Sequence, residues 1–119
     1  MLYNPRHDQV TKDLMRAADL LNRDGWCRKD TDDQGRQCVW RALISSIYIP
    51  PYQMDADTDN DRFRAALSRL AKHLGLEPKV ESDIDIWRWN DHKCKSKQEA
   101  VDTLCAAAGL TADYLEPVS

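Results

Sequence analysis

The stretch GRQCVWRALISS, residues 35–46, decides the fold prediction, because it is the most apolar helix-forming segment of the chain. After Cys38, apolar residues recur at the three- and four-residue steps of one helix face. The helix must end before residues 50–51, both proline, since proline lacks an amide donor and biases the preceding residue away from helix. We therefore predict a central helix whose core candidates are Val39, Trp40, Ala42, Leu43 and Ile47.

Two further segments, before and after this helix, have the same helical spacing. The first covers residues 9–23, where Asp8 can cap the start and Gly25 the end. The second covers residues 60–74, with Gly75 as its candidate cap.

A fourth helix has the clearest start signal. In SKQE, residues 96–99, the Ser96 hydroxyl can accept from the amide of Glu99, whose carboxylate can reach back to the amide of Ser96. The sequence thus predicts a mostly α fold, with residues 1–119 forming a single small domain of about four packed helices.

Two connections between these helices are longer than usual. The first contains DTDDQG, residues 30–35, whose turn-forming residues predict a short β-hairpin or an irregular loop between helices one and two. The second, residues 77–95, contains DIDIWRWND and predicts a short helix or an extended piece packed on the helices.

Composition limits the classes of function. The chain has 119 residues, of which 42% are hydrophobic and 31% charged, enough for one domain with a real core. Its net charge of -3 argues against general binding to nucleic acid or membranes, which needs an excess of lysine and arginine. The chain contains no run of membrane-spanning length and no signal-like start, so we expect a cytoplasmic protein with reduced cysteines.

Cys38 has two interpretations. The exposed amides at a helix start can stabilise a thiolate nucleophile, with His92 as its base and Asn90 or Asp91 as the residue that orients the base. That arrangement would make the protein a small cysteine-dependent hydrolase or transferase. Free cysteine is also among the most buried residue types. We favour a buried, unreactive thiol and expect no catalytic residues.

Metal binding also has candidate residues. Cys27, Cys38, His92 and Cys94 form an alternative zinc set, although none of the cysteines has the close spacing of a zinc knuckle. Two acidic stretches, DTDDQG and DADTDND, resemble the start of a calcium loop but lack its final glutamate. We therefore expect no metal and no other cofactor.

The segment IYIPPYQM, residues 47–54, predicts a binding surface. It is apolar where loops between helices are normally polar, and its two prolines hold the backbone extended, so ordering on a partner costs little entropy. The alternative is that the loop folds back onto the protein's own core. The candidate binding residues are Tyr48, Ile49, Pro50, Pro51, Tyr52 and Met54.

Two stretches, GWCRKDTDDQGRQCVWRAL and WRWNDHKCKSKQEAVDTLCAAAG, carry a resemblance to a known family. Their pattern is Gly-Trp, then Cys-x-x-x-Ala-Leu, then Trp-Asn-Asp. Over roughly residues 10–110 the chain resembles small uncharacterised proteins of actinobacteria and their phages. Arg41 departs from the glycine usual at its position. The family has no established activity, so the resemblance implies a fold and a phage or prophage origin, and no chemistry.

Together these observations predict a non-enzymatic interaction module, a phage or prophage accessory protein that binds a host protein. Its expected partner is a protein of unknown identity or a second copy of the chain, with neither membrane nor nucleic acid. The Trp-Asn-Asp sequence at residues 89–91 is expected to be structural, its indole covering the helices while Asn90 and Asp91 bond neighbouring backbone amides in a turn.

Overall fold

The computed structural model describes residues 8–29, 34–48, 56–76, 82–111 and 115. These residues form helices α1 (Gln9–Asp24), α2 (Val39–Ile47), α3 (Ala56–His73), α4 (Ser82–Arg88) and α5 (Lys97–Ala107), with a π-helical turn η1 (Trp89–Lys93) that continues α4. No strand occurs in this described part of the chain, and none of its helices is long and apolar enough to cross a membrane. The prediction of a mostly helical fold is confirmed.

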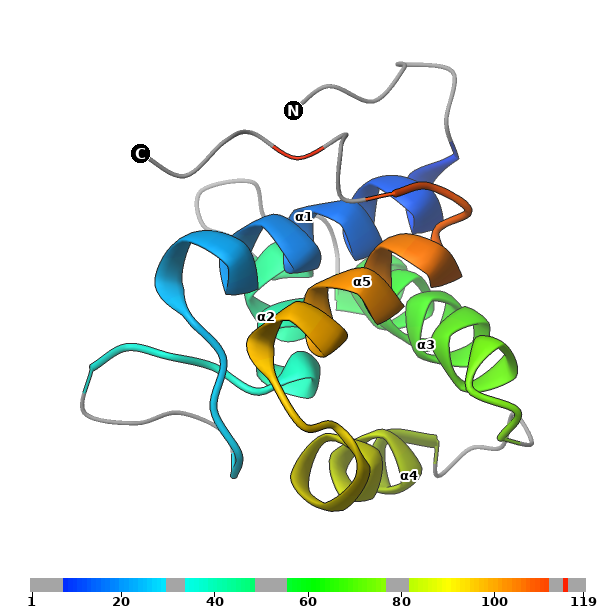
Figure 1. Cartoon of the computed structure of the whole chain (residues 1–119). Coiled ribbons are helices and arrows are strands. Elements are labelled where there is room, and N and C mark those ends of the chain that lie inside the picture. The colour runs from blue at the N-terminus through cyan, green and yellow to red at the C-terminus, as the bar shows by residue number, and fades with distance from the viewer. Residues whose placement is uncertain (1–7, 30–33, 49–55, 77–81, 112–114, 116–119) are drawn as a thin grey trace.

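The helices pack around α1 (Figure 1). Its two largest interfaces are with α5 and α2, and it also contacts α3. α4 lies on the far side of the molecule from α1, against α3 and α2 (Figure 1). The helix with the largest interfaces is therefore α1, not the predicted α2, because its sixteen residues present a longer apolar stripe than the nine of α2.

α1 begins and ends at the predicted caps. The carboxylate of Asp8 accepts from the amide of Thr11 at 2.8 Å, and the amide of Gly25 donates to the carbonyl of Leu21 at 2.9 Å. Gly25 has a φ of 102°, and a β-carbon there would lie 2.7 Å from Cγ of Arg36, so this position requires glycine. The core residues of α1 are Leu14, Met15, Ala17, Ala18 and Leu21.

α3 begins at Ala56, earlier than the predicted residue 60. The acidic run DADTDND was predicted to lie largely before the helix, but its backbone is helical from Ala56 onward. Carboxylates in the first turns of a helix interact favourably with the helix dipole, which gives this run a reason to be helical. A helical backbone cannot wrap its oxygens around a cation as a calcium loop does.

α5 begins with the predicted capping box, in a modified form. The Ser96 hydroxyl accepts from the amide of Glu99 at 3.1 Å, as expected. The Glu99 carboxylate reaches back one residue further than expected and accepts from the amide of Lys95 at 2.8 Å. After the helix, Leu115 is buried against the core, while Tyr114 lies outside the described residues.

The predicted β-hairpin between α1 and α2 is not found. The described part of this connection has instead a single parallel bridge, in which the amide of Cys27 donates to the carbonyl of Gln37 at 3.1 Å and the amide of Gln37 donates to Gly25 at 3.2 Å. A hairpin needs antiparallel arms. Here the chain enters α2 in the same direction as it leaves α1, so the two arms cannot form one.

The connection between α3 and α5 was predicted to be a short helix or an extended piece, and its described part is helical. Its described residues form α4 and then η1. Ile86 is fully buried in the core, whereas Trp87 is 45% exposed. The amide of Cys94 closes η1 by donating to the carbonyl of Trp89 at 2.8 Å.

Candidate functional site

Cys38 caps the start of α2 and is 0% exposed. Its Sγ accepts from the amide of Arg41 at 3.3 Å, an amide that a serine or aspartate cap would otherwise satisfy. A catalytic thiol must meet its substrate, whereas this one is enclosed by the fold. The geometry therefore supports the packing interpretation of Cys38.

The proposed partners of Cys38 lie in η1. His92 is exposed to solvent. The carboxylate of Asp91 accepts from the amide of Lys29 at 2.9 Å and from the side-chain amide of Asn90 at 3.1 Å. A buried thiol and an exposed imidazole do not share the open cleft that a nucleophile and its base require. Asp91 serves instead to hold the segment that follows α1.

Asn90 is buried and joins three segments that are distant in the sequence. Its Oδ1 accepts from the indole Nε1 of Trp26 at 2.7 Å and from the amide of Val39 at 3.0 Å. Its Nδ2 donates to the carbonyl of Cys27 at 3.2 Å. The Gly-Trp pair, the start of α2 and the Trp-Asn-Asp sequence thus form one hydrogen-bonded unit. Asn90 was expected to bond neighbouring amides in a turn, but the partners of its side chain named here are more than fifty residues away in the sequence.

The side chain of Arg28 also bonds to backbone carbonyls in and after η1. Its Nε donates to the carbonyl of Asp91 at 3.0 Å, and one of its terminal nitrogens donates to the carbonyl of Cys94 at 3.2 Å. The guanidinium lies 5.2 Å from the ring centroid of Trp26, within the range of a cation–π contact.

No metal centre is formed by the described residues, because no three of their His, Cys, Asp or Glu side chains come together. The alternative set of Cys27, Cys38, His92 and Cys94 is therefore not gathered at one point. The Sγ atoms of Cys27 and Cys94 donate to backbone carbonyls at 3.3 and 3.4 Å. Burial raises the pKa of the Cys94 thiol, which disfavours the thiolate that zinc needs.

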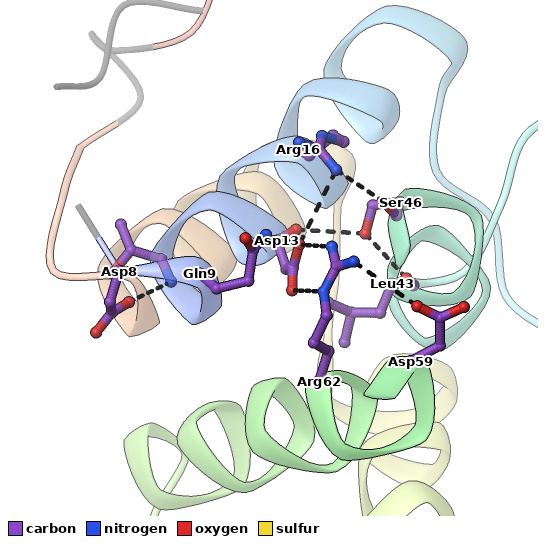
Figure 2. Close-up of polar contacts among 9 residues, drawn as sticks. Asp8, Gln9, Asp13, Arg16, Leu43, Ser46, Asp59 and Arg62 are labelled. Carbon is purple, nitrogen blue, oxygen red and sulfur yellow. Dashed lines mark hydrogen bonds and ion pairs between the residues drawn. The ribbon is translucent and has the colours of Figure 1, made fainter. Parts of the chain in front are cut away.

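A buried ionic cluster joins α1, α2 and α3 (Figure 2). Asp13 is 0% exposed, and Arg62 donates to its two carboxylate oxygens at 2.7 and 3.2 Å. Gln9 donates to the same carboxylate at 2.9 Å. The hydroxyl of Ser46 donates to the backbone carbonyl of Asp13 at 3.3 Å. No apolar spacing rule could have predicted this pairing, which ties α3 to the other two helices.

Asp59 lies on the other side of Arg62. One of its carboxylate oxygens is 3.8 Å from a guanidinium nitrogen, and the residue is buried. Arg62 thus lies between two buried carboxylates, and its hydrogen bond to Asp13 raises the pKa of the guanidinium further. The cluster is enclosed and largely compensated in charge, so we interpret it as a structural connection between helices.

Tyr48 is the one predicted binding residue that the structure describes. It is 38% exposed, its hydroxyl donates to Oδ1 of Asn60 at 2.7 Å, and its ring centroid is 6.0 Å from that of Phe63. The remaining candidates lie outside the described residues: Ile49, Pro50, Pro51, Tyr52 and Met54.

Tyr48 and Phe63 continue into a larger array of aromatic rings. Phe63 meets Trp40 edge-on at 6.2 Å between centroids, and Trp40 lies 5.6 Å from Trp87. The four rings are called the aromatic surface below. Trp40 belongs to α2, Phe63 to α3 and Trp87 to α4, and Tyr48 directly follows α2. Tyr48 and Trp87 lie at its two ends, and they are the large apolar side chains that the described residues expose most. An exposed array of this kind is typical of an interface.

Arginines border the aromatic surface. The guanidinium of Arg41 lies 5.1 Å from the ring centroid of Trp40. Burial, followed by the charge of Asp59, raises the pKa of Tyr48, and the positive charge of Arg64 opposes that rise. Arg64 itself is exposed. Arg88 directly follows Trp87 and is exposed. The surface therefore combines aromatic rings with positive charge.

The sequence alone did not identify this surface. Trp40 was predicted to be a core residue, yet Trp40 and Phe63 are only half-buried, and Trp87 lies in a segment that was expected to pack on the helices. Their spacing is helical within each element, but the contact between a ring of α2 and a ring of α4 arises from tertiary packing. Only Tyr48 was singled out beforehand.

No curated protein and no solved structure matches the chain. A protein family does match, over residues 5–110, and it is described as a family of unknown function, DUF6197. The matched range includes the Asn90 unit, the buried ionic cluster and the aromatic surface. Since the match spans most of the sequence, the chain belongs to this family of unknown function.

Proposed function

We propose that the protein is a non-enzymatic interaction module that binds another protein through the aromatic surface. The observation that carries the proposal is the exposure of Trp87 and Tyr48 at the two ends of one continuous set of rings. Large aromatic side chains are enriched among the residues that dominate binding energy at interfaces. The cytoplasmic location and the protein nature of the partner belong to the same proposal.

The resemblance stated above supports the biological setting of the proposal. In that setting the protein is a phage or prophage accessory factor of actinobacteria, and its partner is a host protein. This origin rests on the resemblance alone. Finding family members repeatedly within prophage gene clusters would support it.

The test compares capture of partners from a host lysate by the wild type, Trp87→Ala and His92→Ala. Trp87 is part of the aromatic surface, whereas His92 is an exposed ring on the adjoining η1 and serves as the matched control. We expect a partner that the wild type and His92→Ala retain and Trp87→Ala loses. Both variants should unfold within about 1 kcal/mol of the wild type, as surface substitutions usually do.

Two other results decide between alternatives. If the same partners bind all three proteins, the aromatic surface is not the binding site and the proposal is wrong. If Trp87→Ala abolishes self-association of the purified wild type in size-exclusion chromatography, the partner is a second copy of the chain. The alternative of a cysteine-dependent hydrolase or transferase requires Cys38 to be accessible, and its burial gives that function no support.

A further inference from the structure

We infer that the partner segment taken by the aromatic surface is acidic and carries a large apolar side chain. This inference rests on the proposed function and adds the chemistry of the ligand. The apolar anchor would pack on Trp87 and Trp40, which lie 5.6 Å apart at the more exposed end of the surface. Carboxylates on either side of the anchor would meet the bordering arginines.

The positions of the charges along α3 favour this ligand. Arg64 and Asn60 are four residues apart, so they share a face of the helix, and Asn60 is the acceptor for the Tyr48 hydroxyl. Arg64 therefore borders the aromatic surface at its Tyr48 end. Asp61 lies two residues before Phe63, which places it nearly opposite that ring on the helix. The acidic group thus points away from the surface while the basic group stays beside it.

The same relationship holds on α4. Arg88 follows Trp87, whereas Asp85 lies two residues before it and so nearly opposite on the helix. Within the described ranges, neither Arg88 nor Arg64 has an ion pair that would neutralise it. The charge of Asp59 acts on Tyr48, but Asp59 is buried beside Arg62. Among the side chains that the structure describes, the rim of the surface is therefore positive, although the whole chain carries a net charge of -3.

The local charge also distinguishes an acidic peptide from a nucleic acid. A single strand would stack its bases on the rings, but its affinity comes largely from a groove of basic residues that follows the phosphates. Here the basic groups are two arginines at the ends of the array and one that lies over a ring. A single acidic side chain needs an ion pair with only one arginine. Electrostatic complementarity between an acidic ligand and these arginines would select the partner.

The experiment measures fluorescence anisotropy of a labelled synthetic peptide that alternates glutamate and leucine around a central phenylalanine. We expect saturable binding that weakens as salt is raised. The double variant Arg64→Glu/Arg88→Glu should bind this peptide about tenfold more weakly, because attraction at both ends becomes repulsion. Lys72→Glu, an exposed charge change near the other end of α3, is the matched control and should leave the affinity unchanged.

Comparison ligands decide what else the surface accepts. A peptide with lysine in place of each glutamate and a labelled oligothymidine should both bind more weakly than the acidic peptide. The inference is overturned if either binds as tightly, if the acidic peptide does not bind, or if the double arginine variant keeps wild-type affinity. A lysate partner that needs Trp87 but ignores the arginine reversal would overturn this inference and leave the proposed function standing. If nothing depends on Trp87, both are wrong.

Discussion

The indole of Trp26 donates to the side-chain oxygen of Asn90 at 2.7 Å, although the two residues are 64 positions apart. The same oxygen accepts from the amide of Val39, at the start of α2. One buried amide group therefore fixes the exit of α1, the entry of α2 and the π-helical turn η1 relative to one another. Removing it would leave two donors buried without acceptors.

Replacing Asn90 with leucine should lower the free energy of unfolding by about 3 kcal/mol, since a buried polar group that loses its partner pays the full cost of desolvation. Urea unfolding followed by circular dichroism measures the change. Asn60→Leu is the control, because Asn60 is exposed and its side chain accepts from the Tyr48 hydroxyl at the surface. Equal losses in the two variants would contradict the importance assigned to the Asn90 unit.

Replacing Arg62 with methionine should cost about 3–5 kcal/mol of stability, because the buried Asp13 carboxylate loses two short hydrogen bonds and keeps Arg16, at 4.0 Å, as its ion-pair partner among the described residues. Arg69→Met is the matched control. Arg69 pairs with Asp8 at 2.9 Å, but the two side chains are 35% and 60% exposed to solvent, so its loss should cost about 0–1 kcal/mol. Thermal unfolding of both variants tests the difference, and the double variant Asp13→Leu/Arg62→Met should recover part of the loss.

Acidification should remove a small stabilising contribution of Asp8. The hydrogen bond from Arg69, followed by that from the amide of Thr11, holds the pKa of Asp8 well below its usual range. A folded pKa below the unfolded value of about 3.9 means that the contribution is complete above that value and disappears as pH falls through the folded pKa. The stability gap between wild type and Asp8→Asn, under about 1 kcal/mol at neutral pH because the pair is exposed, should shrink on acidification. A gap that grows at low pH would contradict this.

Iodoacetamide should label Cys27 first in the folded protein, because its side chain is the one partly exposed thiol of the four cysteines. Cys38, Cys94 and Cys105 are buried, and burial raises the pKa of Cys105 to about 11, which further slows its reaction. Mass spectrometry of peptides from a time course, with Cys27→Ser to remove the fast phase, measures each rate. Rapid labelling of Cys38 would revive the cysteine-dependent enzyme.

Excess calcium or EDTA should leave the thermal midpoint unchanged. A ligand that binds only the folded state must raise the midpoint, and the helical backbone from Ala56 offers no calcium loop. Differential scanning calorimetry with and without each addition is the measurement. A rise with calcium or a fall with EDTA would show that the protein binds a metal.

Local signals were sufficient for the elements whose ends are set by side chains nearby in the sequence. Asp8 and Ser96 cap α1 and α5 where they were expected to, because a cap acts within one turn of its own backbone. The start of α3 was misplaced because acidic residues favour both turns and helix N-termini. The hairpin was wrong because turn-forming residues do not specify the direction in which the two arms leave the turn.

The candidate site was harder to predict for a different reason. The pairing of Asp13 with Arg62 and the contact of Trp40 with Trp87 join separate helices, and a single sequence does not state how helices are arranged. The segment that contains Trp87 was expected to pack on the helices, and within it α4 buries Ile86 while the neighbouring Trp87 is 45% exposed. Tyr48 is 38% exposed, and its role in binding, like that of residues 49–54, stays a prediction.

The hydrogen bond from the Val39 amide to Asn90 also makes the hydrogen exchange of this amide a measure of local unfolding. Amides in the first turn of a helix have no carbonyl partner within the helix and normally exchange their hydrogen with solvent quickly. In this protein the Val39 amide is buried and bonded to a side chain of η1 at 3.0 Å. Hydrogen exchange at this amide therefore requires η1 to separate from α2. The exchange rate of the Val39 amide measures how often that separation occurs.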